Sequence, residues 1–296
     1  MKKILILLSL LSLSLTSQAQ ITIPRESQYA EVMQRIGFTD IRIEYTRPNM
    51  KNRKIFGEGE MVPYGTVWRT GANASTKLSA SKDIYLEGNR IPAGDYALYT
   101  IPQPGDWTII VSKDTSLWGH YGYKEENDLL RFNVTPGAKL DHQESLAIFF
   151  DKVNDKQAVL NLRWGKHVIP ISVKIDEKAQ DAQIVADIKK TLALPDDRDK
   201  PIVVAHDYFH AAVYYMETNR EPEQALNWFD KAIALEDVSY FNLYKSDLLG
   251  KLKRYDEAIE ASKLGLAIFM VTGNNKEWIW RYEQQIEKWK KLKSGS

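Results

Sequence analysis

The chain has 296 residues, a formal net charge of +1 and no cysteine. The absence of cysteine excludes disulfides, thiolate zinc sites, iron–sulfur clusters and a cysteine nucleophile, and a near-neutral charge supplies no broad field for nucleic acid or an anionic membrane. Hydrophobic residues make up 44% and charged residues 27% of the chain, which is the composition of a globular protein of about two domains.

The first 19 residues predict a secretory signal peptide. Two lysines precede an apolar run over residues 4–15, and the small residues Ser17 and Ala19 favour cleavage before Gln20. This run is shorter than the roughly 20 apolar residues that a membrane-spanning helix needs, and no later stretch predicts a span. We therefore expect an exported chain that is periplasmic or extracellular after cleavage.

Residues 20–176 predict an all-β domain. Turn-forming residues such as Pro104-Gly105-Asp106 separate short apolar runs, and short connections indicate antiparallel hairpins. The expected architecture is a β-sandwich or a barrel-like sheet, and the pattern leaves both open. Apolar and polar side chains alternate, as in half-buried strands, over residues 41–46, 107–112, 160–164 and 169–175.

The composition then changes to that of helices, so the chain as a whole is expected to be α+β. Residues 177–200 predict a linker helix, and residues 201–296 predict helical hairpins with a terminal capping helix over residues 275–291. Pro201 predicts the start of the first hairpin helix, because its missing N–H costs little there.

A repeat occurs within these hairpins. Ala225 and Ala258 stand in similar segments 33 residues apart, close to the tetratricopeptide period of about 34 residues. In the first repeat, Ala225 and Ala232 would let paired helices approach, while Phe229 fills the gap between them. Ser262 is one of two less typical residues in the second repeat. We therefore expect a tetratricopeptide-like domain.

The β region carries several motifs in a fixed order. In their order and spacing they resemble the domain of unknown function 2911 family (DUF2911) over residues 27–175. This resemblance implies an exported bacterial domain, with a tetratricopeptide-like C-terminal part in some members, and it brings no established activity or catalytic residue. The motifs are Tyr45-Thr46-Arg47-Pro48, Val62-Pro63-Tyr64-Gly65, Trp68-Arg69-Thr70-Gly71-Ala72-Asn73 and Ile91-Pro92-Ala93-Gly94-Asp95-Tyr96.

Most of the candidate binding residues lie in these motifs; an arginine stands between the first two motifs, and one tryptophan comes from a later aromatic loop. Arginine grips carboxylate or phosphate with a planar fork, tryptophan offers a flat platform, and asparagine both donates and accepts. Together they would line a groove for an anionic or sugar-like ligand. The alternative is a structural role, in which the arginines bond loop carbonyls. The candidates are Arg47, Arg53, Tyr64, Trp68, Arg69, Asn73 and Trp118.

The sequence predicts neither a metal nor a cofactor, and it identifies no catalytic residue. His206 and His210 share a helix face, as in the zinc motif HExxH, but Asp207 replaces the glutamate and no third ligand is evident. The sequence also lacks a G-x-S-x-G elbow and a glycine-rich phosphate loop.

These observations favour a non-catalytic binding or scaffold protein of the cell envelope. The β domain would take the ligand described above, and the helical hairpins would present a groove to a peptide or protein partner. The alternative is a hydrolase that acts on an envelope or extracellular substrate through the same arginine, tryptophan and asparagine residues. In a third reading, the β domain only confers stability.

Overall fold

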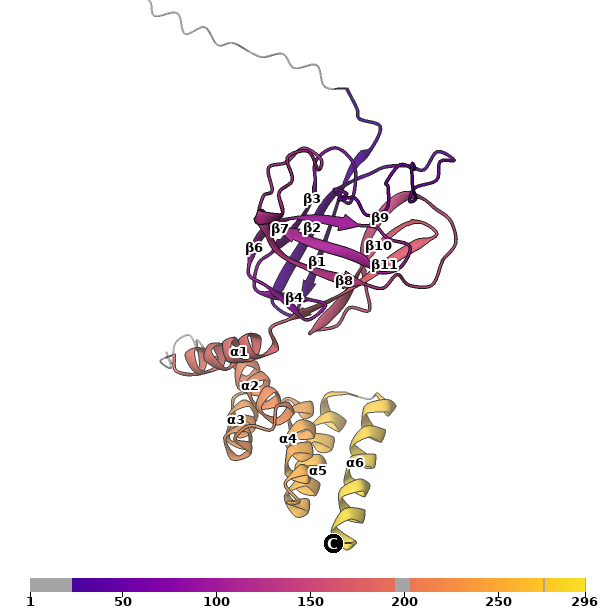
Figure 1. Ribbon diagram of the computed structural model, residues 1–296. Coiled ribbons are helices and arrows are strands. Elements are labelled where there is room, and N and C mark those ends of the chain that lie inside the picture. The colour runs from indigo at the N-terminus through magenta and orange to yellow at the C-terminus, as the bar shows by residue number, and fades with distance from the viewer. Residues whose placement is uncertain (1–22, 195–202, 274, 296) are drawn as a thin grey trace, which may run out of the picture. The chain divides into compact units, whose positions relative to one another are not determined.

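The computed structural model describes residues 23–194, 203–273 and 275–295. The predicted signal peptide at residues 1–19 and its cleavage site lie outside these ranges. The chain divides between Gln180 and Asp181 into two compact units. The first is built from antiparallel strands and the second from helices (Figure 1), which confirms the predicted α+β class.

Two antiparallel sheets form the first unit. The six-stranded sheet has the order β1-β2-β3-β6-β7-β8, and the five-stranded sheet has the order β5-β4-β11-β10-β9. The strands are β1 (Gln28–Ile36), β2 (Thr39–Arg47), β3 (Thr76–Ala80), β4 (Ile84–Leu86), β5 (Asn89–Ile91), β6 (Gly94–Ile101), β7 (Trp107–Ser112), β8 (Asp128–Val134), β9 (Gln143–Asp151), β10 (Gln157–Gly165) and β11 (His167–Ile175).

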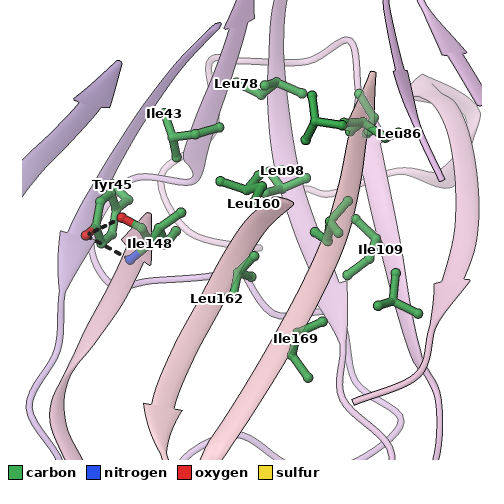
Figure 2. Close-up of a cluster of buried hydrophobic side chains, with 14 of the residues drawn as sticks. Ile43, Tyr45, Leu78, Leu86, Leu98, Ile109, Ile148, Leu160, Leu162 and Ile169 are labelled. Carbon is green, nitrogen blue, oxygen red and sulfur yellow. Dashed lines mark hydrogen bonds between the residues drawn. The ribbon is translucent and has the colours of Figure 1, made fainter. Parts of the chain in front are cut away.

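The core of this unit lies between the two sheets, because alternate residues of each strand point inward. Ile43 and Leu98 from the larger sheet belong to one buried cluster with Leu160 and Ile169 from the smaller sheet (Figure 2). Full burial of each such side chain contributes about 1.5–3 kcal/mol. Two face-to-face sheets that share one core make this unit a sandwich.

At one edge the chain passes from one sheet to the other. After β2, the N–H of Met50 donates to the carbonyl of Glu144 at 3.0 Å, and the N–H of Leu146 donates to the carbonyl of Pro48 at 3.0 Å. Tyr45 adds a second link, since its hydroxyl accepts from the N–H of Ile148 at 3.0 Å. The sandwich is therefore closed in a barrel-like way along β2 and β9.

In the described ranges, six α-helices follow the sheets. Within the second unit, α2 pairs with α3, α4 pairs with α5, and α6 packs on α5. No helix in the described ranges combines the length and apolar character that crossing a bilayer requires. The helices are α1 (Glu177–Leu192), α2 (Ala205–Glu217), α3 (Pro222–Leu235), α4 (Ser239–Lys251), α5 (Tyr255–Thr272) and α6 (Lys276–Ser294).

The repeat residues lie inside the helical core. Ala225, Phe229 and Ala232 are fully buried on α3, as their spacing predicted. Pro201 lies outside the described residues, and α2 begins at Ala205 instead. The carboxylate of Asp207 accepts from the N–H of Val204 at 3.0 Å, so a side chain within the first turn satisfies one of the donors that a helix start leaves unpaired.

Candidate ligand-binding site

Two of the candidate residues belong to the core of the sandwich. The backbone of Trp68 extends the larger sheet, because its N–H donates to the carbonyl of Thr100 at 2.7 Å. Its indole points inward and stacks on Trp164, with ring centroids 5.7 Å apart. Tyr64 is partly buried against the same core. Side chains alternate across an extended segment, so Arg69 projects from the opposite face of the larger sheet.

An aromatic cavity lies beside Trp68. Phe56, Trp107 and Trp164 line it together with His167, and its volume of about 10 Å³ has room for one water molecule. The Nδ1 atom of His167 is buried and has no hydrogen-bond partner in the described part of the chain. Burial lowers the pKa of His167, and the charge of Lys139 lowers it further. This cavity is too small for a ligand.

Two arginines bond the backbone where the end of β2 and the segment after it meet β9. The Nε of Arg47 donates to the carbonyl of Leu146 at 2.8 Å. Arg53 is exposed, and it donates from Nε to Met50 at 2.9 Å and from Nη2 to Asn49 at 3.0 Å. Each guanidinium carries five N–H donors, so both arginines satisfy loop carbonyls and retain donors for a ligand.

A third group of candidates meets where two loops approach each other. The N–H of Ser75 donates to the carbonyl of Leu117 at 3.4 Å, which joins the loop before β3 to the loop after β7. Arg69 from the first loop lies against Gly119 of the second, where an added Cβ would stand 2.7 Å from Nη1. The Nε of Arg69 is buried, and none of the residues that the structure describes forms a hydrogen bond with it.

The first of these loops is held in an unusual conformation. Thr70 and Asn73 have φ angles of 55° and 60°, and a positive φ is strained for a β-branched residue such as threonine. Thr70 is fully buried, and its carbonyl accepts from the hydroxyl of Thr76 at 2.9 Å. Gly71 permits close packing, because a Cβ there would lie 3.1 Å from the carbonyl of Thr46. The loop therefore presents Arg69 and Asn73 in fixed positions.

The segment before β1 completes this end of the sandwich. The amide of Asn73 donates to the carbonyl of Ser27 at 3.4 Å, and the guanidinium of Arg25 lies 4.4 Å from the ring centre of Trp118. Trp118 is 55% exposed, so a cation and an aromatic ring share one surface. Sequence reasoning missed Arg25, because nothing in the sequence pairs it with a tryptophan 93 residues later.

Four arginines carry positive charge at this end, and Glu26 is a carboxylate near them: its bond to Lys51 and, more weakly, the charge of Arg53 lower its pKa. Arg25, Arg47, Arg53 and Arg69 form no ion pair with any carboxylate in the part of the chain that the structure describes. Other arginines of the same unit are paired, for example Arg35 with Asp40 at 2.6 Å. An arginine without a carboxylate can grip the carboxylate or phosphate of a ligand at little cost.

The aromatic loop that carries Trp118 is anchored on the outer face of the larger sheet. The hydroxyl of Tyr123 donates to Asp128 at 2.6 Å, and the Nε of Arg131 donates to the same oxygen at 2.6 Å. Burial and the bond to Asp128 raise the pKa of Tyr123, so it stays protonated. The next residues toward the tip, Tyr121 and His120, are exposed. The loop thus has a fixed base and an exposed aromatic tip.

The two histidines of the second unit have partners of their own. The Nε2 of His206 lies 2.9 Å from the hydroxyl of Tyr240, and the ring centres of His206 and His210 are 6.1 Å apart. Within the described ranges, no group of three or more His, Asp or Glu side chains is placed to hold a metal ion.

No curated protein matches the chain. Residues 27–173 match the family described as "Protein of unknown function (DUF2911)". This match contains both sheets nearly whole, the strained loop and the aromatic loop. Over these residues the β-sandwich resembles the DUF2911 family.

Proposed function

We propose that the protein is a non-catalytic binding protein whose β-sandwich takes an anionic, sugar-like ligand at the end defined by Arg25, Arg69, Asn73 and Trp118. One observation carries the proposal: among the described residues no carboxylate forms an ion pair with Arg25, Arg47, Arg53 or Arg69, and Arg25 lies against an exposed tryptophan. Other arginines of the same unit, such as Arg35 and Arg90, pair with carboxylates.

The chemistry of each group fits one part of such a ligand. The guanidinium of Arg69 offers a fork for a carboxylate or phosphate, and its buried Nε finds no acceptor within the described ranges. Trp118 gives a flat apolar surface for the face of a ring. Asn73 supplies a donor and an acceptor for hydroxyl groups. Fixed loops lower the entropy lost on binding.

We also propose that the protein is exported and that its helices form a tetratricopeptide-like module. The charged and apolar pattern of residues 1–19 supports export. The burial of Ala225, Phe229 and Ala232 supports the module, because close-packed helix pairs need small residues at the crossing. In this proposal the sandwich recognises an envelope or extracellular component and the helices scaffold a partner.

A thermal-shift screen tests the proposed ligand class. The purified protein is heated with inorganic phosphate, acidic oligosaccharides or their neutral counterparts. A ligand at 100 times its dissociation constant stabilises by about 2.7 kcal/mol. We expect stabilisation by acidic sugars, loss of that shift in Arg69→Ala, and its retention in Arg35→Ala, which removes a paired arginine. Equal shifts with neutral sugars, or a full shift in Arg69→Ala, would contradict the proposal.

A further inference from the structure

A second buried cluster lies on the outer face of the larger sheet, beneath the aromatic loop that connects β7 to β8. Strand alternation turns its strand residues away from the core between the sheets, and all of them are fully buried. Leu117 and Tyr123, both from the loop, pack against them. The loop, residues 113–127, therefore has an apolar support of its own. The buried residues of this cluster are Ala97, Tyr99 and Ile110.

Two tyrosines of this cluster hold the loop through their hydroxyl groups. Tyr99, from β6, donates to the carbonyl of Gly119 at 3.5 Å, and its ring centre lies 5.1 Å from that of Tyr123. The hydroxyl of Tyr123 donates to the carboxylate of Asp128 at 2.6 Å and accepts from the Nη2 of Arg131 at 2.6 Å. Tyr123 therefore joins the loop to both an anion and a cation of β8.

The carboxylate of Asp128 depends on this hydroxyl. Its side chain is 7% exposed, so water solvates it poorly. One oxygen, Oδ2, accepts from Tyr123 and from the Nε of Arg131, whereas the buried Oδ1 has no hydrogen-bond partner among the described residues. A buried charged group that loses a donor costs more than a neutral one. Without the Tyr123 hydroxyl, Asp128 would keep a single donor, which favours a shift of the loop that lets water reach the carboxylate.

The same loop carries part of the proposed ligand site. Trp118 precedes Tyr123 by five residues, and its ring lies against the guanidinium of Arg25. The next residue, Gly119, leaves the space that the guanidinium of Arg69 occupies. A shift at Tyr123 would therefore change both the position of Trp118 and the support of Arg69.

We propose that Tyr123 is a positioning residue for the ligand site of the sandwich. Its hydroxyl, bound to Asp128 and Arg131, holds the aromatic loop in one conformation. The loop in turn presents Trp118 and supports Arg69, so Tyr123 raises the affinity for the ligand without touching it, because a preorganised loop loses less entropy on binding. This inference rests on the proposed function of the sandwich, since it concerns the same site.

Amide hydrogen exchange of the ligand-free, full-length protein tests whether the hydroxyl holds the loop. Tyr123→Phe keeps the ring that packs on Tyr99 and removes the hydroxyl. Its control is Tyr121→Phe, because Tyr121 is 73% exposed at the tip of the same loop. The amides of Lys113 and Tyr123 are the probes, since carbonyls of the loop accept from both. We expect these amides, or that of Phe at position 123, to exchange at least about fivefold faster in Tyr123→Phe alone. Equal rates in the two variants would overturn the proposal.

Isothermal titration with an oligogalacturonate tests whether the held loop matters for recognition. We expect the affinity to fall at least about fivefold in Tyr123→Phe and to stay unchanged in Tyr121→Phe. An unchanged affinity in Tyr123→Phe would refute the positioning role, even if the loop amides exchange faster. No binding by the natural protein would overturn the proposed function and with it the role of Tyr123 in recognition, whereas the exchange rates would still show whether its hydroxyl holds the loop.

Discussion

The guanidinium of Arg69 rests directly on Gly119, although 50 residues separate them in the sequence. An added Cβ at Gly119 would stand 2.7 Å from the Nη1 atom. Gly119 therefore does more than permit a turn, because it leaves the space in which the arginine of the strained loop is held. This contact links the Trp-Arg-Thr-Gly motif to the aromatic loop and defines the proposed site.

A pair of glycine variants tests this contact. Gly119→Ala and Gly122→Ala both place a side chain at a positive φ, of 82° and 81°, so each should lose about 1 kcal/mol of unfolding free energy. Only Gly119→Ala displaces Arg69, since a Cβ at Gly122 meets just Leu117 at 3.6 Å. Calorimetric binding to an acidic oligosaccharide should weaken in Gly119→Ala alone. Equal weakening in both would mean that backbone strain, not Arg69, controls binding.

Two tryptophan variants separate stability from recognition. Trp164 is 2% exposed and stacks on Trp68, whereas Trp118 is 55% exposed. We expect Trp164→Ala to lower the unfolding free energy by about 3–5 kcal/mol. Trp118→Ala should change it by less than about 0.5 kcal/mol and remove the stacking surface for the ligand. Urea unfolding and ligand titration measure the two effects, and a large stability loss in Trp118→Ala would count against a recognition role.

We expect His167 to contribute to the pH dependence of the unfolding free energy. Burial lowers the pKa of His167 below its ordinary value. The imidazole of His167 therefore binds a proton less readily in the folded state than in the unfolded state. The contribution of neutral His167 to the unfolding free energy is complete above about pH 6.5, the pKa of histidine in the unfolded chain. It is lost as the pH falls from there toward the lower pKa of His167 in the folded protein. Urea midpoints between pH 8 and pH 5 should decline less steeply in His167→Gln than in the natural protein. Parallel declines would assign the effect to other groups.

Packing of the last helix can be tested at Gly250. Alanine favours a helix interior over glycine by about 1 kcal/mol, but a Cβ at Gly250 would overlap the buried ring of Trp289. That ring cannot easily move, because its Nε1 donates to Ser246 at 2.9 Å. We expect Gly250→Ala to lose about 1–3 kcal/mol by overpacking. Gly105→Ala, where a Cβ meets nothing within 4 Å, should be nearly neutral in the same thermal unfolding experiment.

Local periodicity predicted much of the fold. The alternating runs at residues 107–112 and 169–175 coincide with β7 and β11, and the predicted terminal helix over residues 275–291 coincides with most of α6. The strand β1 was not predicted. Tyr29 and Met33 lie on its exposed face, and because they are apolar the strand does not show a regular alternation of apolar and polar residues. Periodicity indicates which face of a strand is buried only when the other face is polar.

The candidate site was predicted less completely, because its geometry depends on contacts between distant segments. The motif containing Trp68 and Arg69 is visible in the sequence, but strand alternation sends one side chain into the core and the other to the outer face of the sheet. The pairing of Arg25 with Trp118 depends on how the segment before β1 meets a loop after β7. No local pattern encodes such a meeting of loops.

The most direct test of the account is isothermal titration of the purified protein with an oligogalacturonate and with a neutral galactose oligomer of the same length. The account predicts binding of the acidic oligomer, an affinity that falls as salt screens the charges, and at least about tenfold weaker binding in Arg69→Ala than in Arg35→Ala. Equal affinity for both oligomers, or equal affinity in the two arginine variants, would contradict the claim that these unpaired arginines recognise an anionic ligand.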